Sequence, residues 1–209
     1  MRDNRTGDRW GSSRVLVAVA IFAATLALAS CGSSGGQADD SDDAGTGGDA
    51  QSPVVIDQPS LVSGDRIPVP RGEPVVTLTG QLEAANRGST VELDLATLQA
   101  MGLIKVRVYE PWAKKDLEFR AVDLADVLDV AGALPQATSV HLTALDDYEV
   151  DLTMTDVRDG GVLVATASGN GRELPIDKGG PTRIIFTDGT EAGAASEQWI
   201  WSIKTIDVR

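Results

Sequence analysis

Phe119-Arg120-Ala121-Val122-Asp123-Leu124-Ala125-Asp126-Val127-Leu128, followed by Ala131-Gly132, is the stretch that decides the fold of this 209-residue chain. Asp123 is a residue type that favours the N-cap of a helix. Apolar residues then follow at i, i+3, i+4 and i+7, which is the spacing of one buried helical face: Leu124, Val127, Leu128 and Ala131. Gly132 is typical of a helix C-terminus. The stretch therefore predicts a strand near 117–119 and a short helix after it.

The rest of the chain surrounds this helix with strands. Asp94 precedes Leu95, Leu98 and Met101, and Gly102 follows, so a second short helix is expected there. β-branched or alternating runs predict strands at 75–80, 90–93, 104–109, 140–144, 148–152, 162–167, 183–187 and 199–208. After Pro135 the pattern is strand-like to the end. We therefore expect an α+β fold: one mixed, strand-rich domain over 74–209, with two or more short helices.

The order of these pieces resembles the molybdopterin-binding domain of sulfite-oxidase-type oxidoreductases. The first stretch quoted above is similar to the family's "F-x-G-V-x-L-x-D-L-L…A-G" segment. Three further stretches match in order, namely Asp147-Tyr148 to a "D-G-Y" turn, Gly179-Gly180-Pro181-Thr182-Arg183 to a "G-x-P-x-R" turn, and Gln198-Trp199-Ile200 with Ile203 to a closing "K-W-I…I" strand. The resemblance implies the family's fold over most of the domain.

The sequence departs from this family where the metal would bind. In the family, a cysteine just before the helix segment coordinates molybdenum through sulfur, which is a soft ligand. The corresponding stretch, Val106 to Pro111, contains no cysteine, although Tyr109 or Glu110 could offer oxygen. Gln198 replaces the family's lysine, and Ala121 replaces its glycine. Fold does not imply function by itself, so the metal site does not carry over.

Cys31 is the only cysteine, and it follows an apolar segment that ends in Leu28-Ala29-Ser30. Four arginines lie before that segment, and its 15 residues, Val15 to Ala29, fall short of the roughly 20 that span a bilayer. A basic start, a short apolar core and small residues at the cut are typical of a secretory signal. The run resembles a bacterial lipobox, so we expect a signal peptide over 1–30 and a lipid on Cys31; an uncleaved signal-anchor is the alternative.

Composition separates this leader from the domain. Residues 31–53 contain Gly, Ser and five aspartates but no large apolar side chain, so we expect a disordered acidic tether. Residues 54–73 form a Pro-rich arm. The formal net charge of −13 offers no phosphate-neutralising stripe, so nucleic acid is not expected as a partner. We expect a location in the cell envelope, with the chain lipid-anchored on the extracytoplasmic face of the membrane.

Lys178 and Arg183 flank the Gly-rich turn at 179–181 and are candidate ligand-binding residues. An arginine there could form a bidentate contact with a carboxylate, phosphate or sulfate. The alternative is a strand-entry arginine that pairs with one of the chain's acids. His141, the only histidine, alternates with Val140 and Leu142 and is interpreted as an ordinary strand residue.

Trp112, Lys114, Asp147 and Tyr148 are the other candidates. Trp112 and Lys114 lie in a basic, aromatic loop of an acidic domain, and exposed aromatic residues mark interfaces. An ordinary hairpin loop is the alternative, as is a simple turn for Asp146-Asp147-Tyr148. Trp199 and Trp201 share one face of the predicted last strand, and core packing explains them.

We therefore expect a membrane-anchored lipoprotein whose domain is a non-catalytic binding module. Its partner would be a small anionic ligand or an envelope protein, and no catalytic residue, metal or cofactor is expected. The alternative is a molybdopterin-dependent oxidoreductase with an atypical metal ligand, and a purely structural role in complex assembly is a third hypothesis. The motivating observation is a chain that resembles the family in the order of its motifs but lacks the metal-ligating sulfur.

Overall fold

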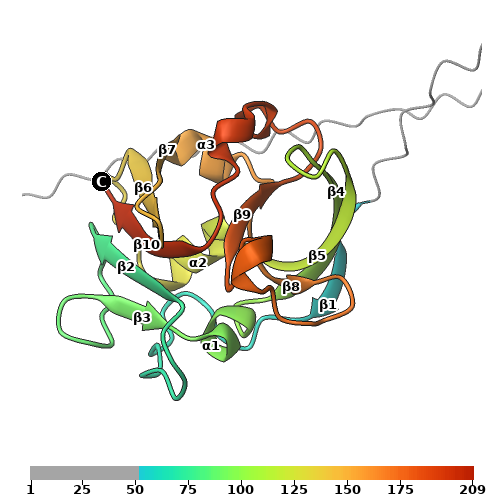
Figure 1. The fold of residues 1–209 in the computed structure, drawn as a ribbon. Helices are drawn as coiled ribbons and strands as arrows, with labels where there is room; N and C mark the ends of the chain where they lie inside the picture. The colour runs from blue at the N-terminus through green and yellow to red at the C-terminus, as the bar shows by residue number, and fades with distance from the viewer. Residues whose placement is uncertain (1–51) are drawn as a thin grey trace, which may run out of the picture. The chain divides into compact units, whose positions relative to one another are not determined.

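The computed structural model describes residues 52–209, which form two five-stranded sheets with short helices around them (Figure 1). The predicted leader, Cys31 and nearly all of the predicted tether lie outside the described residues. Sheet A has the strand order β1-β4-β5-β8-β9 and is antiparallel throughout. Its strands are Val54–Asp57, Leu103–Glu110, Lys115–Asp123, Val162–Ser168 and Arg183–Phe186.

Sheet B has the strand order β3-β2-β10-β6-β7. Its strands, in that order, are Val91–Leu93, Val76–Gly80, Ile203–Val208, Ser139–Ala144 and Glu149–Thr153. β10 pairs in parallel with β2, where Ile206 lies opposite Leu78, and antiparallel with β6. The central strand of this sheet is therefore contributed by the last described strand of the chain.

The two predicted helices are confirmed. α1 spans Leu95–Gln99, and the Asp94 side chain accepts a hydrogen bond from the Thr97 N–H at 2.8 Å. α2 spans Leu124–Val130, and the Asp123 side chain accepts from the Ala125 N–H at 2.9 Å. The predicted apolar face of α2 is fully buried. Both helices are followed by a glycine with positive φ, 113° at Gly102 and 68° at Gly132, which only glycine adopts without strain.

Two elements differ from the sequence prediction. α3 spans Met154–Arg158 in a region expected to be only strand, and it begins with a capping box between Thr153 and Asp156. The last strand was predicted to start at Trp199, but β10 starts at Ile203. Ser202 has a φ of 51°, so the extended chain is interrupted just before the strand. The other predicted strands are present.

One apolar core lies within the domain and takes side chains from both sheets. β8 is buried over six successive residues and is almost entirely apolar, as expected for a strand covered on both faces. The residues of the predicted arm contribute as well: β1 pairs with β4, and Leu61 and Ile67 are buried in the core. No helix among the described residues is long and apolar enough to cross a membrane.

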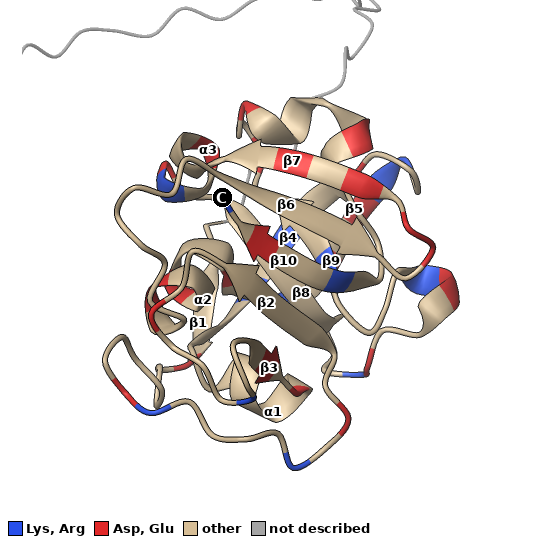
Figure 2. Ribbon diagram, turned by 90° about the vertical axis from the view of Figure 1, so that its left-hand side faces the viewer, with Lys and Arg blue, Asp and Glu red and all other residues tan. Residues whose placement is uncertain are grey.

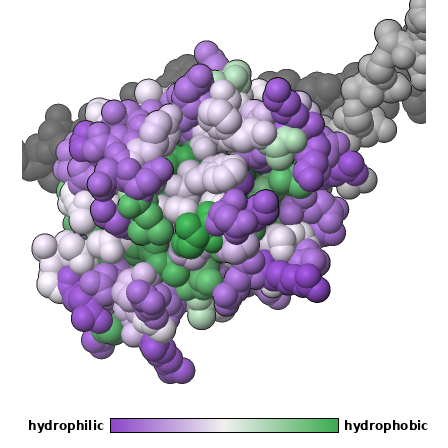
Figure 3. Space-filling model, in the orientation of Figure 1, coloured by the Kyte–Doolittle hydropathy of each residue, from purple (hydrophilic) through white to green (hydrophobic). Residues whose placement is uncertain are grey.

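The surface is predominantly acidic, in keeping with 31 Asp and Glu against 18 Lys and Arg in the chain. Figure 2 shows acidic positions on β3, β7 and several loops, with fewer basic positions between them. On the face seen in Figure 1, apolar and near-neutral residues gather in the middle of a hydrophilic rim (Figure 3).

Candidate functional site

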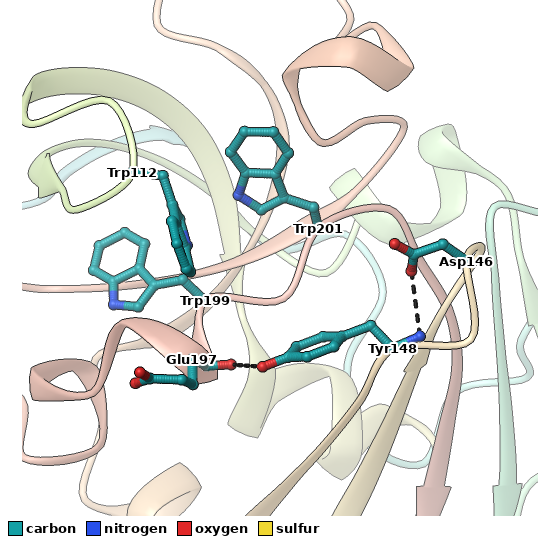
Figure 4. A pocket seen from close by; sticks show the side chains of 6 residues that line it. All are labelled: Trp112, Asp146, Tyr148, Glu197, Trp199 and Trp201. Atoms are coloured by element: carbon teal, nitrogen blue, oxygen red, sulfur yellow. Dashed lines mark hydrogen bonds between the residues drawn. The ribbon is translucent and has the colours of Figure 1, made fainter.

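Three loops meet to form a cavity of about 370 Å³ that we name the aromatic pocket (Figure 4). The loops are the β4–β5 hairpin, the β6–β7 turn and the segment that precedes β10. The lining side chains are three indoles, one phenol and two acidic residues: Trp112, Trp199, Trp201, Tyr148, Asp146 and Glu197.

Hydrogen bonds fix several of these side chains. The Tyr148 hydroxyl donates to the Glu197 carbonyl oxygen at 2.8 Å, which joins the β6–β7 turn to the segment before β10. The Tyr148 N–H donates to Oδ1 of Asp146 at 3.2 Å. Nε1 of Trp199 donates to the Gly193 carbonyl oxygen at 2.9 Å. The ring centroids of Trp199 and Phe186 lie 5.5 Å apart. Most of the pocket wall is therefore positioned before any ligand arrives.

The pocket has a buried part and an exposed part. Trp199 is 6% exposed, whereas Trp112 is 55% and Tyr148 is 46% exposed. In Figure 4, Trp201, Trp112, Trp199 and Tyr148 surround an open space, with Asp146 on the side away from Trp112 and Trp199. The Glu197 carboxylate points away from the Tyr148 ring, so this residue meets the pocket mainly through its backbone.

A second cavity, of about 570 Å³, shares Trp112 and Trp201 with the first, and we name it the arginine pocket. Glu110, Lys178 and Arg183 line it. The two pockets are therefore neighbours that share tryptophan side chains.

Arg183 and Glu110 form a buried ion pair in the wall of the arginine pocket. Nη2 of Arg183 lies 2.6 Å from Oε1 of Glu110, and the two side chains are only 3% and 1% exposed. The other oxygen of Glu110 accepts from the Ala113 N–H. Burial lowers the pKa of Arg183, and the hydrogen bond and charge of Glu110 oppose that shift. The arginine charge is thus compensated from within the protein.

Aromatic rings cover the same guanidinium group. Cζ of Arg183 lies 4.5 Å from the Trp201 ring centroid and 5.5 Å from that of Phe119. Nη1 donates to the Lys178 carbonyl oxygen at 3.4 Å, while Nε has no hydrogen-bond partner among residues 52–209. Arg183 therefore pairs with an acid at the start of a strand, and because it also lines the arginine pocket, its role in ligand binding stays a prediction.

The candidate residues divide between the pockets. Trp112 and Tyr148 line the aromatic pocket, and Trp112, Lys178 and Arg183 line the arginine pocket. Asp147 and Lys114 line neither. Asp147 has a φ of 62° and accepts from Nζ of Lys204 at 3.3 Å, and Lys114 has a φ of 51° in the hairpin turn.

Several residues of the two pockets were not among the candidates, among them Glu110, Asp146, Glu197, Trp199 and Trp201. Trp199 is buried and packs on Phe186, as expected, but it also forms part of a pocket wall. One available signal was that three of the chain's four tryptophans lie in predicted loops or at a strand start. His141 is 13% exposed, with Nδ1 2.8 Å from Asp151, which agrees with an ordinary strand residue.

The fold and the order of its elements define a molybdopterin-binding domain of the sulfite-oxidase type. The family model described as "oxidoreductase molybdopterin binding domain" matches residues 72–209, and the chain belongs to this family. Among solved structures, the chain is similar to the sulfane dehydrogenase SoxCD from Paracoccus pantotrophus, with a TM-score of 0.50 and 15% identity. The match covers 64% of this chain and 37% of that one. No curated protein matches the sequence.

The residues of this domain do not fit a molybdenum ion. The family ligand is a cysteine thiolate, and the chain's only cysteine, Cys31, lies outside the matched residues. Within residues 52–209, no group of three or more His, Cys, Asp and Glu side chains is arranged to hold a metal. Glu110, which could have offered oxygen, uses both carboxylate oxygens within the protein. The domain therefore has the family fold without the family's metal donor.

Proposed function

We propose that this protein is an extracytoplasmic lipoprotein whose molybdopterin-oxidoreductase-like domain binds a ligand or a protein partner without catalysing a reaction. Two observations carry the proposal. The residues that match the family contain no cysteine, and the arginine of the family's Gly-rich turn is held by Glu110 in a buried ion pair.

The ion pair favours a binding role over a redox role. It engages the Arg183 guanidinium and the Glu110 carboxylate, which are the groups that a cofactor or a metal would contact. Because Glu110 compensates the Arg183 charge, the attraction of this arginine for a phosphate or an oxyanion is reduced, although Nε remains a free donor among residues 52–209. Glu110 likewise keeps no free oxygen for a metal. The tryptophan-lined cavity beside this pair has the concave, mostly apolar character of a small-molecule site.

The location is proposed from the sequence. A lipid on Cys31 would hold the protein at the outer face of a membrane, because acyl chains are buried at about 0.8 kcal/mol per CH₂. The tether, whose five aspartates repel one another, would let the domain stand away from the lipid surface.

Metal analysis tests the binding-module proposal against its alternative, an oxidoreductase with an atypical ligand. The full chain would be produced in molybdenum-replete cells, beside a family member that has the cysteine. We expect stoichiometric molybdenum and oxidised-pterin fluorescence only from the control. Tightly held molybdenum in this protein would refute the proposal, and pterin without metal would favour a pterin-binding module.

A further inference from the structure

We infer that the aromatic pocket binds an organic cation with a quaternary ammonium group. This inference rests on the proposed function, since it names the class of ligand that the binding module takes. It concerns the aromatic pocket and not the arginine pocket, where the expectation of a small anion arose from Lys178 and Arg183.

The first argument is the chemistry of the wall. Three indoles and one phenol line a cavity of about 370 Å³, which is of the size that small organic ligands occupy. The face of an aromatic ring is the negative end of its quadrupole, and it attracts a cation within about 6 Å. A quaternary ammonium group suits such a wall because its methyl groups also contact apolar surface and need no hydrogen-bond acceptors.

The second argument is charge. The charged side chain that faces the pocket is that of Asp146, whereas Glu197 lines it mainly through its backbone, and no lysine, arginine or histidine among residues 52–209 lines it. Oδ1 of Asp146 accepts a hydrogen bond from the Tyr148 N–H at 3.2 Å. This hydrogen bond holds the carboxylate opposite Trp112 and Trp199. An anion would meet this carboxylate and no compensating cation. A cation would gain from both the carboxylate and the rings.

The third argument is that two cations near the pocket, Lys204 and Arg183, are engaged elsewhere. Nζ of Lys204 lies 3.3 Å from Asp147, and Arg183 lies 2.6 Å from Glu110. Arg183 also lies 4.5 Å from the Trp201 ring centroid. Because the Arg183 guanidinium already lies over the Trp201 ring, we assign the attraction for a ligand cation mainly to Trp112, Trp199 and Tyr148. The exposed surface of Trp112 and Tyr148 is apolar area that a bound ligand would cover.

Choline and its neutral isostere 3,3-dimethylbutan-1-ol form the matched pair of probes, since they share a shape and differ in charge. Each probe would be titrated into the full chain, and binding would be followed by calorimetry and by intrinsic tryptophan fluorescence. Fluorescence is suitable because three of the four tryptophans line this pocket. We expect choline to bind at least about tenfold more tightly than the alcohol, because cation–π attraction in a desolvated site is of that size.

Two variants and a control assign the binding to this pocket. Asp146→Asn keeps the oxygen that accepts the Tyr148 N–H and removes the charge, so it should weaken choline about fivefold and leave the alcohol unchanged. Trp112→Ala should weaken choline similarly and still fold, because Trp112 is 55% exposed. Asp159→Asn makes the same chemical change away from both pockets and should have no effect. Thermal unfolding confirms that each variant is folded.

Three outcomes would overturn the inference. Equal affinity for choline and the alcohol would show an apolar pocket without charge selection. Failure of choline to bind would show that the rings do not form a cation site. Sulfate binding that Asp146→Asn strengthens would show an anion site, because Asp146 lines the aromatic pocket and not the arginine pocket. These results are independent of metal content, so stoichiometric molybdenum would refute the proposed function while leaving the choline titration to decide this inference.

Discussion

Glu110 and Arg183 are the two residues on which the interpretation of this domain depends. Both are shielded from solvent and they lie 2.6 Å apart. A buried pair of this kind contributes little net stability relative to apolar residues, because both charges lose their hydration. Removing one partner is costly, since the other charge is then buried alone.

Glu110→Leu should therefore lower the free energy of unfolding by about 3 to 5 kcal/mol at pH 7. The double variant Glu110→Leu, Arg183→Met should recover most of this loss because no unpaired charge remains. Urea unfolding followed by circular dichroism measures both. Asp116→Asn, in the exposed pair with Arg107 at 3.1 Å, is the control and should cost less than about 1 kcal/mol. A single variant as stable as the double variant would contradict this account.

At the scale of elements, the helices α1 and α2 begin in the same way but in different electrostatic surroundings. Hydrogen bonds from Thr97, Gly72 and Arg71 lower the pKa of Asp94 to about 2, with the side chain of Thr97 the largest cause. Burial raises the pKa of Asp123, and the hydrogen bond from Ala125 only partly opposes it. The charged form of the N-cap is therefore favoured by folding at α1 and disfavoured at α2.

These opposite shifts predict opposite effects of one substitution. Asp94→Asn should lower stability above pH 4 by about 1 to 2 kcal/mol, and the difference from the natural chain should vanish as the pH falls from about 4 to 2. Asp123→Asn keeps an N-cap side chain and removes a desolvated charge, so stability at pH 7 should stay equal or rise. Stability above pH 4 that is unchanged in Asp94→Asn would contradict the assignment.

The contrast between local and distant signals explains how much of the fold could be predicted. The two helices with an Asp N-cap and a following glycine were predicted because all of that information is local in sequence. The capping box of Thr153 and Asp156 was also local, but it lies between alternating runs that favoured strand. Strand order was not predictable, since the pairing of β10 with β2 joins residues more than 100 positions apart, such as Ile206 and Leu78.

The same reasoning applies to the site. Trp112 and Tyr148 were predicted because they lie in turns of an otherwise acidic domain. Trp201 was not, because the sequence pattern continued the last strand through it, whereas the structure interrupts the chain at Ser202 and β10 starts at Ile203. Asp146 was not, because it was interpreted as part of a simple turn. Glu110 was considered only as a residue that could offer oxygen to a metal, and its buried partner, Arg183, is 73 residues away.

At the scale of the whole molecule, the described domain and the predicted anchor are separate parts. The matched domain starts at residue 72, and the packed residues of the arm, such as Leu61 and Ile67, extend it toward the tether. The proposed lipid site lies at Cys31, well before them. Attachment and folding should therefore respond independently to substitution.

Cys31→Ala should move the protein from the membrane fraction to the soluble extracytoplasmic fraction and abolish labelling by radioactive palmitate. The unfolding midpoint of the domain should not change, because Cys31 precedes every residue of the apolar core. Cell fractionation with a Cys31→Ser comparison provides the measurement. A variant that stays in the membrane fraction would favour the uncleaved signal-anchor.

The central position of β10 has a consequence for biosynthesis. During synthesis, β3 with β2 and β6 with β7 emerge as two hairpin-like pairs that have no ladder between them. They join only when Ile203–Val208 has left the ribosome. Sheet B of the nascent chain is thus incomplete until β10 appears, and if the protein is exported as we propose, this delay would keep the chain compatible with passage through a narrow translocation channel.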